Sequence, residues 1–329
     1  MREASIIATV RNEEGTITDF VDSLLNQSYK PEEIIIVDGV STDGTRELLE
    51  EYDERGEIIL VSEECNIAQG RNIGISKASS EIIAVTDAGC IVSESWLENI
   101  MNCFSSTPEP DVVAGNFRFD CHTLFEEVVS LATFSPDREE TDAARYYPSS
   151  RSLAFKKSAW KKAHGYPEWL YAAEDTLFNI RMRQLGLQFA FAKNAIVRWR
   201  PRESWSALAK QRFNFARGNA RVGIGTQGYI SYLKHLAGIF LLLLAGLLSP
   251  WLMLLSILPV IQHIRHNLLP HAIRAEEKSE KKGLRWYIVL VMEFVRFVSI
   301  TGFLAGRIDR IVDRKYIQNQ KNWMGTSEL

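Results

Sequence analysis

Residues 82–90 read IIAVTDAGC, an apolar run that ends in one acidic residue followed by three small ones. A short apolar run closed by a small-residue turn is typical of a buried strand. This strand would carry Asp87 to the edge of a sheet, which is where open α/β sheets bind their ligands. An isolated Asp can equally cap a helix or satisfy a turn, so the neighbouring segments must decide between these interpretations.

Apolar runs alternate with helical stretches over the first third of the chain. We expect strands at 4–10, 32–38, 57–62, 81–87 and 111–119, and helices at 17–27, 45–52, 68–77 and 96–104. Such alternation is typical of βαβ units around a mainly parallel sheet. The sequence therefore predicts an α/β fold of the Rossmann-like, nucleotide-binding type.

The composition of the 329 residues is ordinary for a globular protein, with 24% charged and 46% hydrophobic residues and a net charge of -3. The four cysteines show no C-x-x-C spacing and the N-terminus does not resemble a secretory signal, so we expect a reduced, cytosolic soluble part without a zinc site. Basic residues concentrate in residues 198–234. The net charge of the whole chain is negative, and the sequence shows no recognisable nucleic-acid-binding motif. We therefore expect this segment to bind nucleotide or lipid phosphates, and no nucleic-acid partner is expected.

The apolar residues concentrate after residue 236. Residues 236–262 contain no charged residue, and Ser249-Pro250 near the middle predicts a break, so we expect a helical hairpin in a membrane. A further apolar segment, 286–304, contains Glu293 and Arg296, whose spacing permits a pair. This segment could span the membrane or lie at its interface. Membrane lipids are therefore expected partners.

Polar residues follow several of the predicted strands. The first strand ends in ATVRNEEGT rather than in a glycine-rich dinucleotide fingerprint, which disfavours hydride-transfer chemistry. Asp38 ends the second strand, Arg71 opens a helix and Asp87 ends a later strand. Three polar residues at one edge are harder to explain structurally than one.

This arrangement resembles the family 2 glycosyltransferases, which have a GT-A fold, and the likeness covers about residues 4–220. The resemblance implies that Asp38 contacts the base or ribose of a nucleotide sugar, with assistance from Arg71. It implies that Asp87 lies near the diphosphate and the metal ion. Thr9 and Arg11, in the segment 9–12, would complete the nucleotide wall.

The chain departs from the usual family pattern at two places. The common Asp-Asp-Gly-Ser is here Asp38-Gly39-Val40-Ser41, and Gly89 replaces the second acid of Asp-x-Asp. Hard divalent cations are held by carboxylate oxygens, phosphates and water, so Asp87 with a diphosphate would hold Mg²⁺ or Mn²⁺ only weakly. We expect one of these cations as the cofactor.

Residues 165–186, GYPEWLYAAEDTLFNIRMRQLG, resemble the family's Gly-Tyr-Pro-Glu loop and the Glu-Asp pair that follows it. By this likeness Asp175 is the general base, because an acceptor hydroxyl must lose its proton as it attacks the anomeric carbon with inversion. Glu174 would raise the pKa of that base or orient the acceptor. The structural alternative is that helix N-termini favour acidic residues.

Residues 210–221, KQRFNFARGNAR, loosely resemble the Gln-x-x-Arg-Trp element of membrane-bound members, although the Trp position is not matched. Gln211, Arg212 and Arg217 would then stabilise the departing nucleoside diphosphate. They could equally form a basic belt that holds anionic lipid heads, and both roles can coexist. Where other members place a His ligand, this chain has Arg198 or Arg200 to replace part of the metal's charge.

These observations predict an inverting glycosyltransferase with a GT-A domain over 1–225 and a membrane-anchoring helical region over 226–329. It would transfer a sugar from a nucleotide-sugar donor to a lipid-linked or polysaccharide acceptor at the cytoplasmic face of the plasma membrane. Two alternatives stay open: a polyprenyl-phosphate glycosyl donor synthase, and a non-catalytic nucleotide-sugar-binding membrane protein. Gly89 favours the second alternative, whereas Glu174 and Asp175 oppose it.

Overall fold

The computed structural model describes residues 2–134 and 148–324. The chain forms two compact units, which we call the sheet unit (1–120, 140–200 and 321–329) and the helical unit (121–139 and 201–320). These units divide the chain at other residues than the predicted domains 1–225 and 226–329, which stay predictions. Residues 133–151, which mix charged residues, Pro and Ser, also predict an irregular loop, and most of this segment lies outside the described residues.

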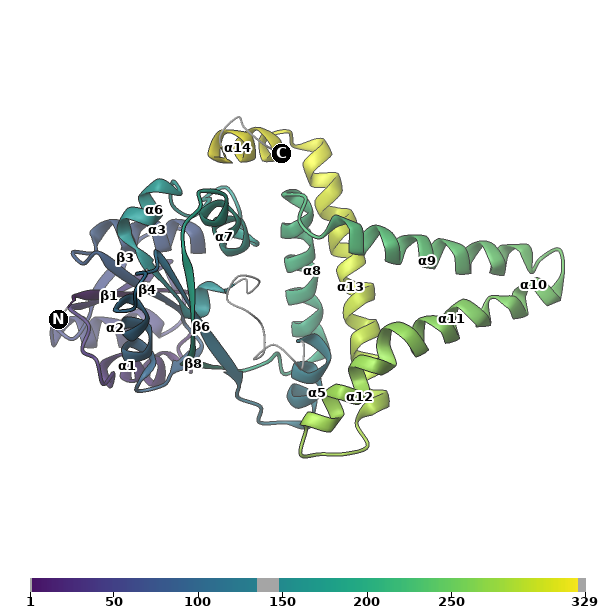
Figure 1. The fold of residues 1–329 in the computed structure, drawn as a ribbon, viewed down its shortest axis with the longest axis horizontal. Coiled ribbons are helices and arrows are strands. Elements are labelled where there is room, and N and C mark those ends of the chain that lie inside the picture. Colours follow the sequence, from purple (N-terminus) through teal and green to yellow (C-terminus); the bar gives the residue numbers. More distant parts are fainter. Residues whose placement is uncertain (1, 135–147, 325–329) are drawn as a thin grey trace. The chain divides into compact units, whose positions relative to one another are not determined.

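The sheet unit contains an eight-stranded mixed sheet (Figure 1). Its order is β3-β2-β1-β4-β7-β6-β8-β5, with parallel pairing of β1 to β2 and β4, of β2 to β3 and of β6 to β8. Strand β7 is antiparallel to both of its neighbours. The strands are β1 (Ala4–Val10), β2 (Glu33–Asp38), β3 (Ile59–Ser62), β4 (Ile82–Asp87), β5 (Cys90–Val92), β6 (Val112–Phe119), β7 (Leu153–Lys156) and β8 (Phe189–Trp199).

The predicted α/β fold is confirmed, and each expected strand and helix of the first 119 residues is present. Figure 1 shows α1 and α2 on the opposite side of the sheet from α3 and α6. Strands β5, β7 and β8 were not predicted. Strands β5 and β7 are runs of three and four residues, which are too short to show an alternating pattern. The helices of this unit are α1 (Ile17–Leu25), α2 (Thr45–Glu54), α3 (Ile67–Lys77), α4 (Trp96–Phe104), α6 (Lys157–Lys162) and α7 (Glu174–Gln184).

One face of the sheet packs against α3 and α7. Ile7 and Val85 of the central strands belong to one buried cluster with Ile75 of α3 and Phe178 of α7. Gly74 lets α3 approach β1 closely, because a Cβ at this position would lie 2.6 Å from Cγ2 of Ile7. This close approach places the N-terminus of α3 beside the carboxyl end of β1.

The register of the central strands brings the predicted site residues to one edge. Thr9 of β1 lies opposite Val37 of β2 and Asp87 of β4, and Val10 lies opposite Asp38. Since these three strands are parallel, their carboxyl ends share an edge of the sheet. The edge therefore carries Thr9, Asp38 and Asp87 together.

The helical unit has its own hydrophobic core, formed by α5, α8, α12 and α13. Val128, Leu208, Ala272 and Ile288 are buried in this cluster. The helices are α5 (Leu124–Thr133), α8 (Trp205–Arg221), α9 (Thr226–Ala245), α10 (Pro250–Leu255), α11 (Ile257–His263), a π-helix η3 (Ile264–Leu268), α12 (Leu269–Lys278) and α13 (Arg285–Val312), and the chain continues into α14 (Lys315–Met324). The expected hairpin is present, with its break before Pro250.

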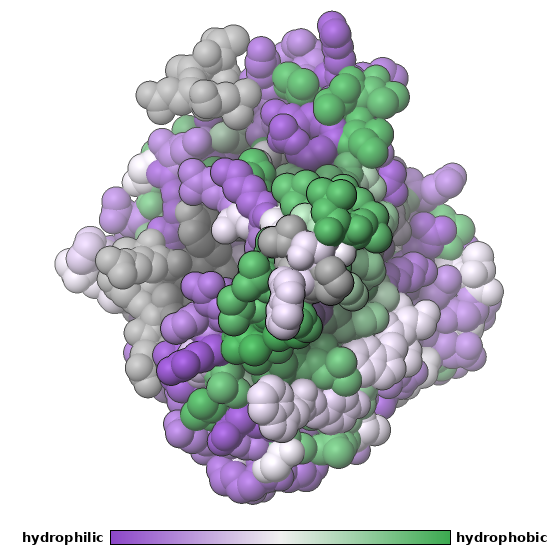
Figure 2. Space-filling view, turned by 90° about the vertical axis from the view of Figure 1, so that its right-hand side faces the viewer, coloured by the Kyte–Doolittle hydropathy of each residue, from purple (hydrophilic) through white to green (hydrophobic). Residues whose placement is uncertain are grey.

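Two described helices are long and apolar enough to cross a membrane, namely α9 and α13. None of the α9 window is buried inside the protein, whereas 39% of the α13 window is, which also fits a core helix. Figure 2 shows apolar side chains gathered around the hairpin. Near its tip Leu247 and Leu248 are more than 80% exposed, and Trp251 is 76% exposed. An exposed apolar patch of this kind marks a surface that contacts lipid or another protein.

We predict that Gly74→Ala destabilises the sheet unit by about 1–3 kcal/mol, because the added methyl group would overpack the α3–β1 contact. Urea denaturation measures the change. Gly15→Ala is the control, since nothing lies within 4 Å of a Cβ at residue 15. Equal stability of the two variants would contradict the close-packing interpretation.

Candidate active site

Two loops at the sheet edge are joined by hydrogen bonds. Asn12 donates its backbone N–H to Oγ of Ser41 at 2.9 Å, and its Oδ1 accepts from the backbone N–H of Thr42 at 2.8 Å. The backbone N–H of Glu13 donates to Oγ1 of Thr45 at 2.8 Å. The loop after β1 and the loop after β2 therefore hold each other in place beside Thr9 and Asp38.

Asp38 is fully buried and is bonded inside the protein. Its carboxylate accepts the hydroxyl of Ser41 at 2.6 Å and the hydroxyl of Ser62 at 3.2 Å. Val40 has φ of 58°, which is strained for a β-branched residue. The observed contacts of Asp38 thus shape this loop, and its contact with a nucleotide stays a prediction.

Arg71 joins three segments that are distant in the sequence. One guanidinium nitrogen lies 2.6 Å from Oδ1 of Asp87, and another lies 2.9 Å from Oε1 of Glu174. Only 1% of Arg71 is exposed, and its guanidinium lies 5.2 Å from the centre of the Tyr166 ring. The residue predicted to assist nucleotide binding is therefore, in the structure, a buried link between Asp87 and Glu174.

The start of α3 explains how Arg71 reaches this position. Asn66 and Gln69 form a reciprocal capping box that fixes the first turn of the helix. Gly70 permits close packing on β1, since a Cβ there would lie 2.8 Å from Cγ2 of Thr9. Arg71 then follows directly on the face that meets the sheet edge.

The next residue of α3, Asn72, holds the loop that leads to α7. Its side-chain amide donates to the carbonyl of Tyr166 at 2.9 Å and to Oε1 of Glu168 at 2.8 Å. Its Oδ1 accepts the backbone N–H of Tyr166 at 2.8 Å, and the Tyr166 ring stacks on Phe178 with centroids 4.2 Å apart. The Gly-Tyr-Pro-Glu loop is therefore fixed from both sides.

Helix α7 begins at the predicted catalytic pair. Ala173 precedes it in the left-handed conformation, with φ of 68°, and Glu174 follows as a buried residue. Asp175 is only partly buried, and its Oδ1 accepts the backbone N–H and the hydroxyl of Thr176. The two neighbouring acids thus have different surroundings, one facing Arg71 and one closer to solvent.

Burial and the neighbouring Asp175 raise the pKa of Glu174 to about 7, although Arg71 opposes the shift. A group with a pKa near neutrality can hold or release a proton under ordinary conditions. A carboxyl of this kind beside a more exposed carboxylate is an arrangement found at catalytic sites. The Glu174–Asp175 pair is therefore suited to proton transfer. Acidic residues that only stabilised the N-terminus of the helix would not need a carboxyl pKa near 7.

No sequence motif pointed to Arg151. Its guanidinium lies 3.9 Å from the centre of the Trp199 ring and 5.2 Å from that of Phe117. Trp199 pairs with Cys90 across β5 and β8, so Arg151 lies near the strand that follows Asp87. Burial raises the pKa of the Cys90 thiol to about 12, against the influence of Arg151, so this thiol is inert.

Gln211, Arg212 and Arg217 lie in α8 of the helical unit. Arg217 forms a two-pronged contact with Asp309 of α13, at 2.7 and 3.0 Å. Arg221 shares the same carboxylate at 2.7 Å. The roles predicted for the three α8 residues at the leaving group stay predictions, and Arg217 has a structural partner.

No group of three or more potential metal-ligating side chains occurs among residues 2–134 and 148–324. Asp87 is partly exposed, with 24% of its side chain accessible, and gives Oδ1 to Arg71. A divalent cation at this edge would therefore need phosphate oxygens and water in addition to protein carboxylates. That donor set fits a cation bound together with a nucleoside diphosphate.

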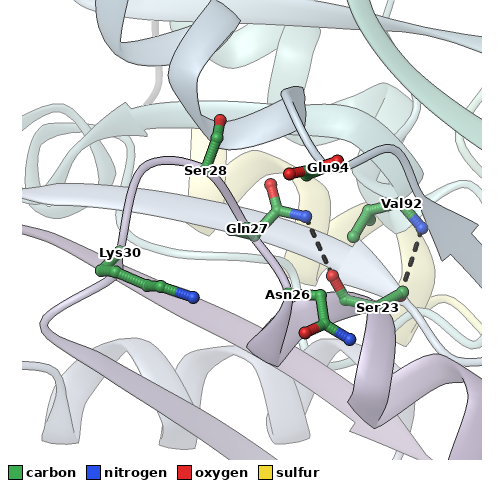
Figure 3. A pocket seen from close by; sticks show the side chains of 7 residues that line it. All are labelled: Ser23, Asn26, Gln27, Ser28, Lys30, Val92 and Glu94. Atoms are coloured by element: carbon green, nitrogen blue, oxygen red, sulfur yellow. Dashed lines mark hydrogen bonds between the residues drawn. The ribbon is translucent and has the colours of Figure 1, made fainter.

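A separate pocket of about 510 Å³ lies at the other end of α1 (Figure 3). It is lined by Ser23, Asn26, Gln27, Ser28, Lys30, Val92 and Glu94. Gln27 and the backbone N–H of Val92 bond to Ser23 there. Because α1 begins beside Glu13 and ends beside this pocket, the pocket does not belong to the candidate site.

We predict that Arg71→Met lowers the free energy of unfolding by about 3–5 kcal/mol, because two carboxylates lose their buried partner. Arg46→Met, which breaks an exposed pair with Glu50, should cost at most about 0.5 kcal/mol. Urea denaturation compares them.

The stability of Arg71→Met should also depend on pH more strongly than that of wild type. The pKa of Glu174 is raised from 4.5 to about 7, so its contribution to stability is present below pH 4.5 and is lost as the pH rises through 7. Without Arg71 the charged form is still less favourable, so Arg71→Met should lose more stability than wild type between about pH 5 and 8. Parallel pH profiles of the two proteins would contradict the coupling.

Several known proteins have sequences similar to this chain. Residues 5–163 match the family described as Glycosyl transferase family 2. The chain is 25% identical over 226 residues to Glycosyltransferase AglE of Haloferax volcanii, covering 66% of this chain and 73% of that protein. It is 26% identical over 228 residues to a poly-beta-1,6-N-acetyl-D-glucosamine synthase of Staphylococcus epidermidis, covering 66% of this chain and about half (55%) of that protein.

A solved structure has a similar fold over most of the chain. The mannosyltransferase PcManGT from Pyrobaculum calidifontis, determined in complex with GDP-Man and Mn²⁺, matches with a TM-score of 0.57 at 17% identity. The match covers 92% of this chain and 88% of that one. Residues 5–163 therefore match a glycosyl transferase family 2 domain, the fold of the chain is GT-A-like, and both findings support a glycosyltransferase.

Proposed function

We propose that the protein is an inverting glycosyltransferase that moves a sugar from a nucleotide-sugar donor to a lipid-linked or polysaccharide acceptor. The observation that carries this proposal is the buried contact of Arg71 with both Asp87 and Glu174. It ties the edge proposed for the donor diphosphate to the helix proposed for the base. Thr9, Arg11 and the Asp38 loop would form the nucleotide wall at the same edge.

The proposed chemistry is a single in-line displacement. The acceptor oxygen forms a bond to the anomeric carbon while the bond from that carbon to the diphosphate oxygen breaks. Asp175 takes the proton of the acceptor hydroxyl, and the nucleoside diphosphate leaves with the bonding electrons. Glu174, held by Arg71, positions the start of α7 so that Asp175 faces the acceptor.

A divalent cation is proposed as the cofactor, with Asp87 as a ligand. The similar mannosyltransferase was determined in complex with GDP-Man and Mn²⁺, which supports a nucleotide-sugar donor and a cation of this class. Mg²⁺ or Mn²⁺ would neutralise charge that develops on the leaving diphosphate. Gln211, Arg212 and Arg217 are proposed to assist from α8 or to hold anionic lipid heads.

Two features of the helical unit, a polar pocket and an apolar hairpin, support the proposal that the acceptor is held in a membrane. A pocket of about 900 Å³ in this unit is lined partly by Tyr232, His235, His263 and Arg296, beside the apolar hairpin. Ionisable residues in membrane segments typically mark substrate pathways. We propose that the protein lies at the plasma membrane with its sheet unit in the cytoplasm, and that its acceptor is amphipathic with a polar head.

One assay tests the enzyme class. The purified full-length protein with membranes is incubated with a panel of nucleotide sugars, and release of nucleoside diphosphate is measured. Release with a single sugar would identify the donor. Adding either a polyprenyl phosphate or a saccharide acceptor then separates a polyprenyl-phosphate glycosyl donor synthase from a polysaccharide-forming enzyme. Binding of nucleotide sugar without turnover with any acceptor would instead favour the non-catalytic alternative.

We predict that Asp175→Asn lowers kcat by roughly 10²- to 10⁴-fold while donor binding stays close to wild type, because only the proton acceptor is removed. Asp38→Asn should instead weaken nucleotide binding, since the loop hydrogen bonds with Ser41 and Ser62 depend on its carboxylate. Asp19→Asn, at an exposed position of α1, is the control. Normal turnover by Asp175→Asn would place the base elsewhere.

We predict that the full-length protein stays in the membrane fraction after carbonate washing, because α9 and α13 are apolar enough to insert. Arginine replacements at Leu241 and Leu244, exposed in the apolar C-terminal part of α9, should release it or reduce its insertion. Arginine replacements at the exposed polar positions Glu47 and Glu54 of α2 serve as the control. Recovery of the unmodified protein in the carbonate supernatant would exclude membrane insertion.

A further inference from the structure

The sequence lacks an acid at residue 89, but the structure places a carboxylate from another loop in the same space. Gly89 has φ of 77° and follows β4 two residues after Asp87. A Cβ at residue 89 would lie 3.4 Å from Oε2 of Glu13, and 3.7 Å from both Oε1 and Cδ of the same side chain. The carboxyl group of Glu13 therefore occupies the region into which a residue-89 side chain would project.

Glu13 is held in this position by its own loop. Its Oε2 accepts the hydroxyl of Thr16 at 3.0 Å, and its backbone N–H donates to Oγ1 of Thr45 at 2.8 Å. Its carbonyl accepts the backbone N–H groups of Thr16 and Ile17 at 2.9 Å, at the start of α1. The hydrogen bond from Thr16 reaches the carboxylate itself, and such hydrogen bonds orient metal-ligating carboxylates in known sites.

Strand register brings the loop that contains Glu13 to the sheet edge that carries Asp87. Thr9 of β1 lies opposite Asp87 of the neighbouring parallel strand β4, and Glu13 follows Thr9 by four residues in the loop at the same edge. Arg71 contacts Oδ1 of Asp87, so a cation would take the second oxygen, Oδ2. The edge thus offers two carboxylates, one from the end of β4 and one from the loop after β1.

We propose that Glu13 supplies the second carboxylate for the divalent cation, in place of the acid that Gly89 lacks. This inference rests on the proposed function, because the remaining ligands would be the donor's diphosphate oxygens and water. Hard cations such as Mg²⁺ are commonly held by one or two carboxylates together with substrate phosphates. The acid that residue 89 lacks is thus matched by a carboxylate from the loop after β1, which lies in the same space.

A direct contact of Glu13 with the nucleotide's ribose is the competing role, and the two differ in their dependence on metal. Isothermal titration calorimetry of the full-length protein with UDP and with GDP, each in Mn²⁺ and in EDTA, separates them. In wild type, Mn²⁺ should tighten binding of at least one nucleotide. In Glu13→Gln, the Mn²⁺-dependent increase in nucleotide affinity should be at least about 10-fold smaller, while the affinity in EDTA stays within about twofold of the wild-type value.

Two further variants sharpen the test. Glu14→Gln, the adjacent acid in the same loop, should keep the Mn²⁺-dependent increase. Gly89→Asp combined with Glu13→Gln should restore it, because Asp tolerates the left-handed conformation of residue 89 and the neutral amide removes charge repulsion. Electron paramagnetic resonance of Mn²⁺ in the presence of the same nucleotide gives an independent measure of bound cation.

The outcomes separate this inference from the proposed function. Equal losses of affinity for Glu13→Gln in Mn²⁺ and in EDTA would show a metal-independent contact and overturn the inference. A Glu13→Gln protein that keeps the full Mn²⁺-dependent increase would overturn it as well, while leaving nucleotide-sugar binding intact. Failure of wild type to bind either nucleotide would instead count against the proposed function.

Discussion

The buried guanidinium of Arg71 is the interaction on which the rest of the site depends. A buried cation is costly unless it is paired and hydrogen-bonded, and Arg71 meets this condition through Asp87 and Glu174. The planar guanidinium presents separate nitrogens in fixed directions, so it contacts both carboxylates at once, which a lysine ammonium on a flexible chain does less well. The contact with Glu174 links residues 103 positions apart. The start of α7, which is proposed to carry the base, is therefore positioned by the same group that contacts the edge proposed for the donor.

Backbone strain is concentrated around this site. In the described part of the chain four residues other than glycine have positive φ, and three of them are Asn12, Val40 and Ala173. Asn12 and Val40 lie in the two loops that bond to each other at the sheet edge, and Ala173 immediately precedes Glu174. Strained conformations of this kind persist only where surrounding contacts enforce them, and they are typical of functional sites. The strain thus agrees with the position of the proposed chemistry.

The helical unit satisfies the polar residues of its apolar helices through contacts between helices. The sequence permitted a pair between Glu293 and Arg296. In the structure each of the two residues contacts His263 of α11, at 3.1 and 3.3 Å respectively. Tyr232 of α9 donates to Glu293 as well. A polar cluster shared by three helices satisfies groups that would be costly alone in an apolar environment, and it leaves them beside a pocket.

The sequence by itself determined the α/β architecture, the apolar hairpin and the positions of Asp38, Arg71, Asp87 and Asp175 on their elements. These follow from local periodicity and from motifs, which act over a few residues. Only the tertiary structure decided that Arg71 is buried between Asp87 and Glu174, that Arg151 covers Trp199 and that Glu13 fills the space beside Gly89. Short strands such as β5 and β7 also left no local pattern to detect. The physical reason is that strand register and helix packing set these contacts across long sequence separations, and local periodicity contains no information on them.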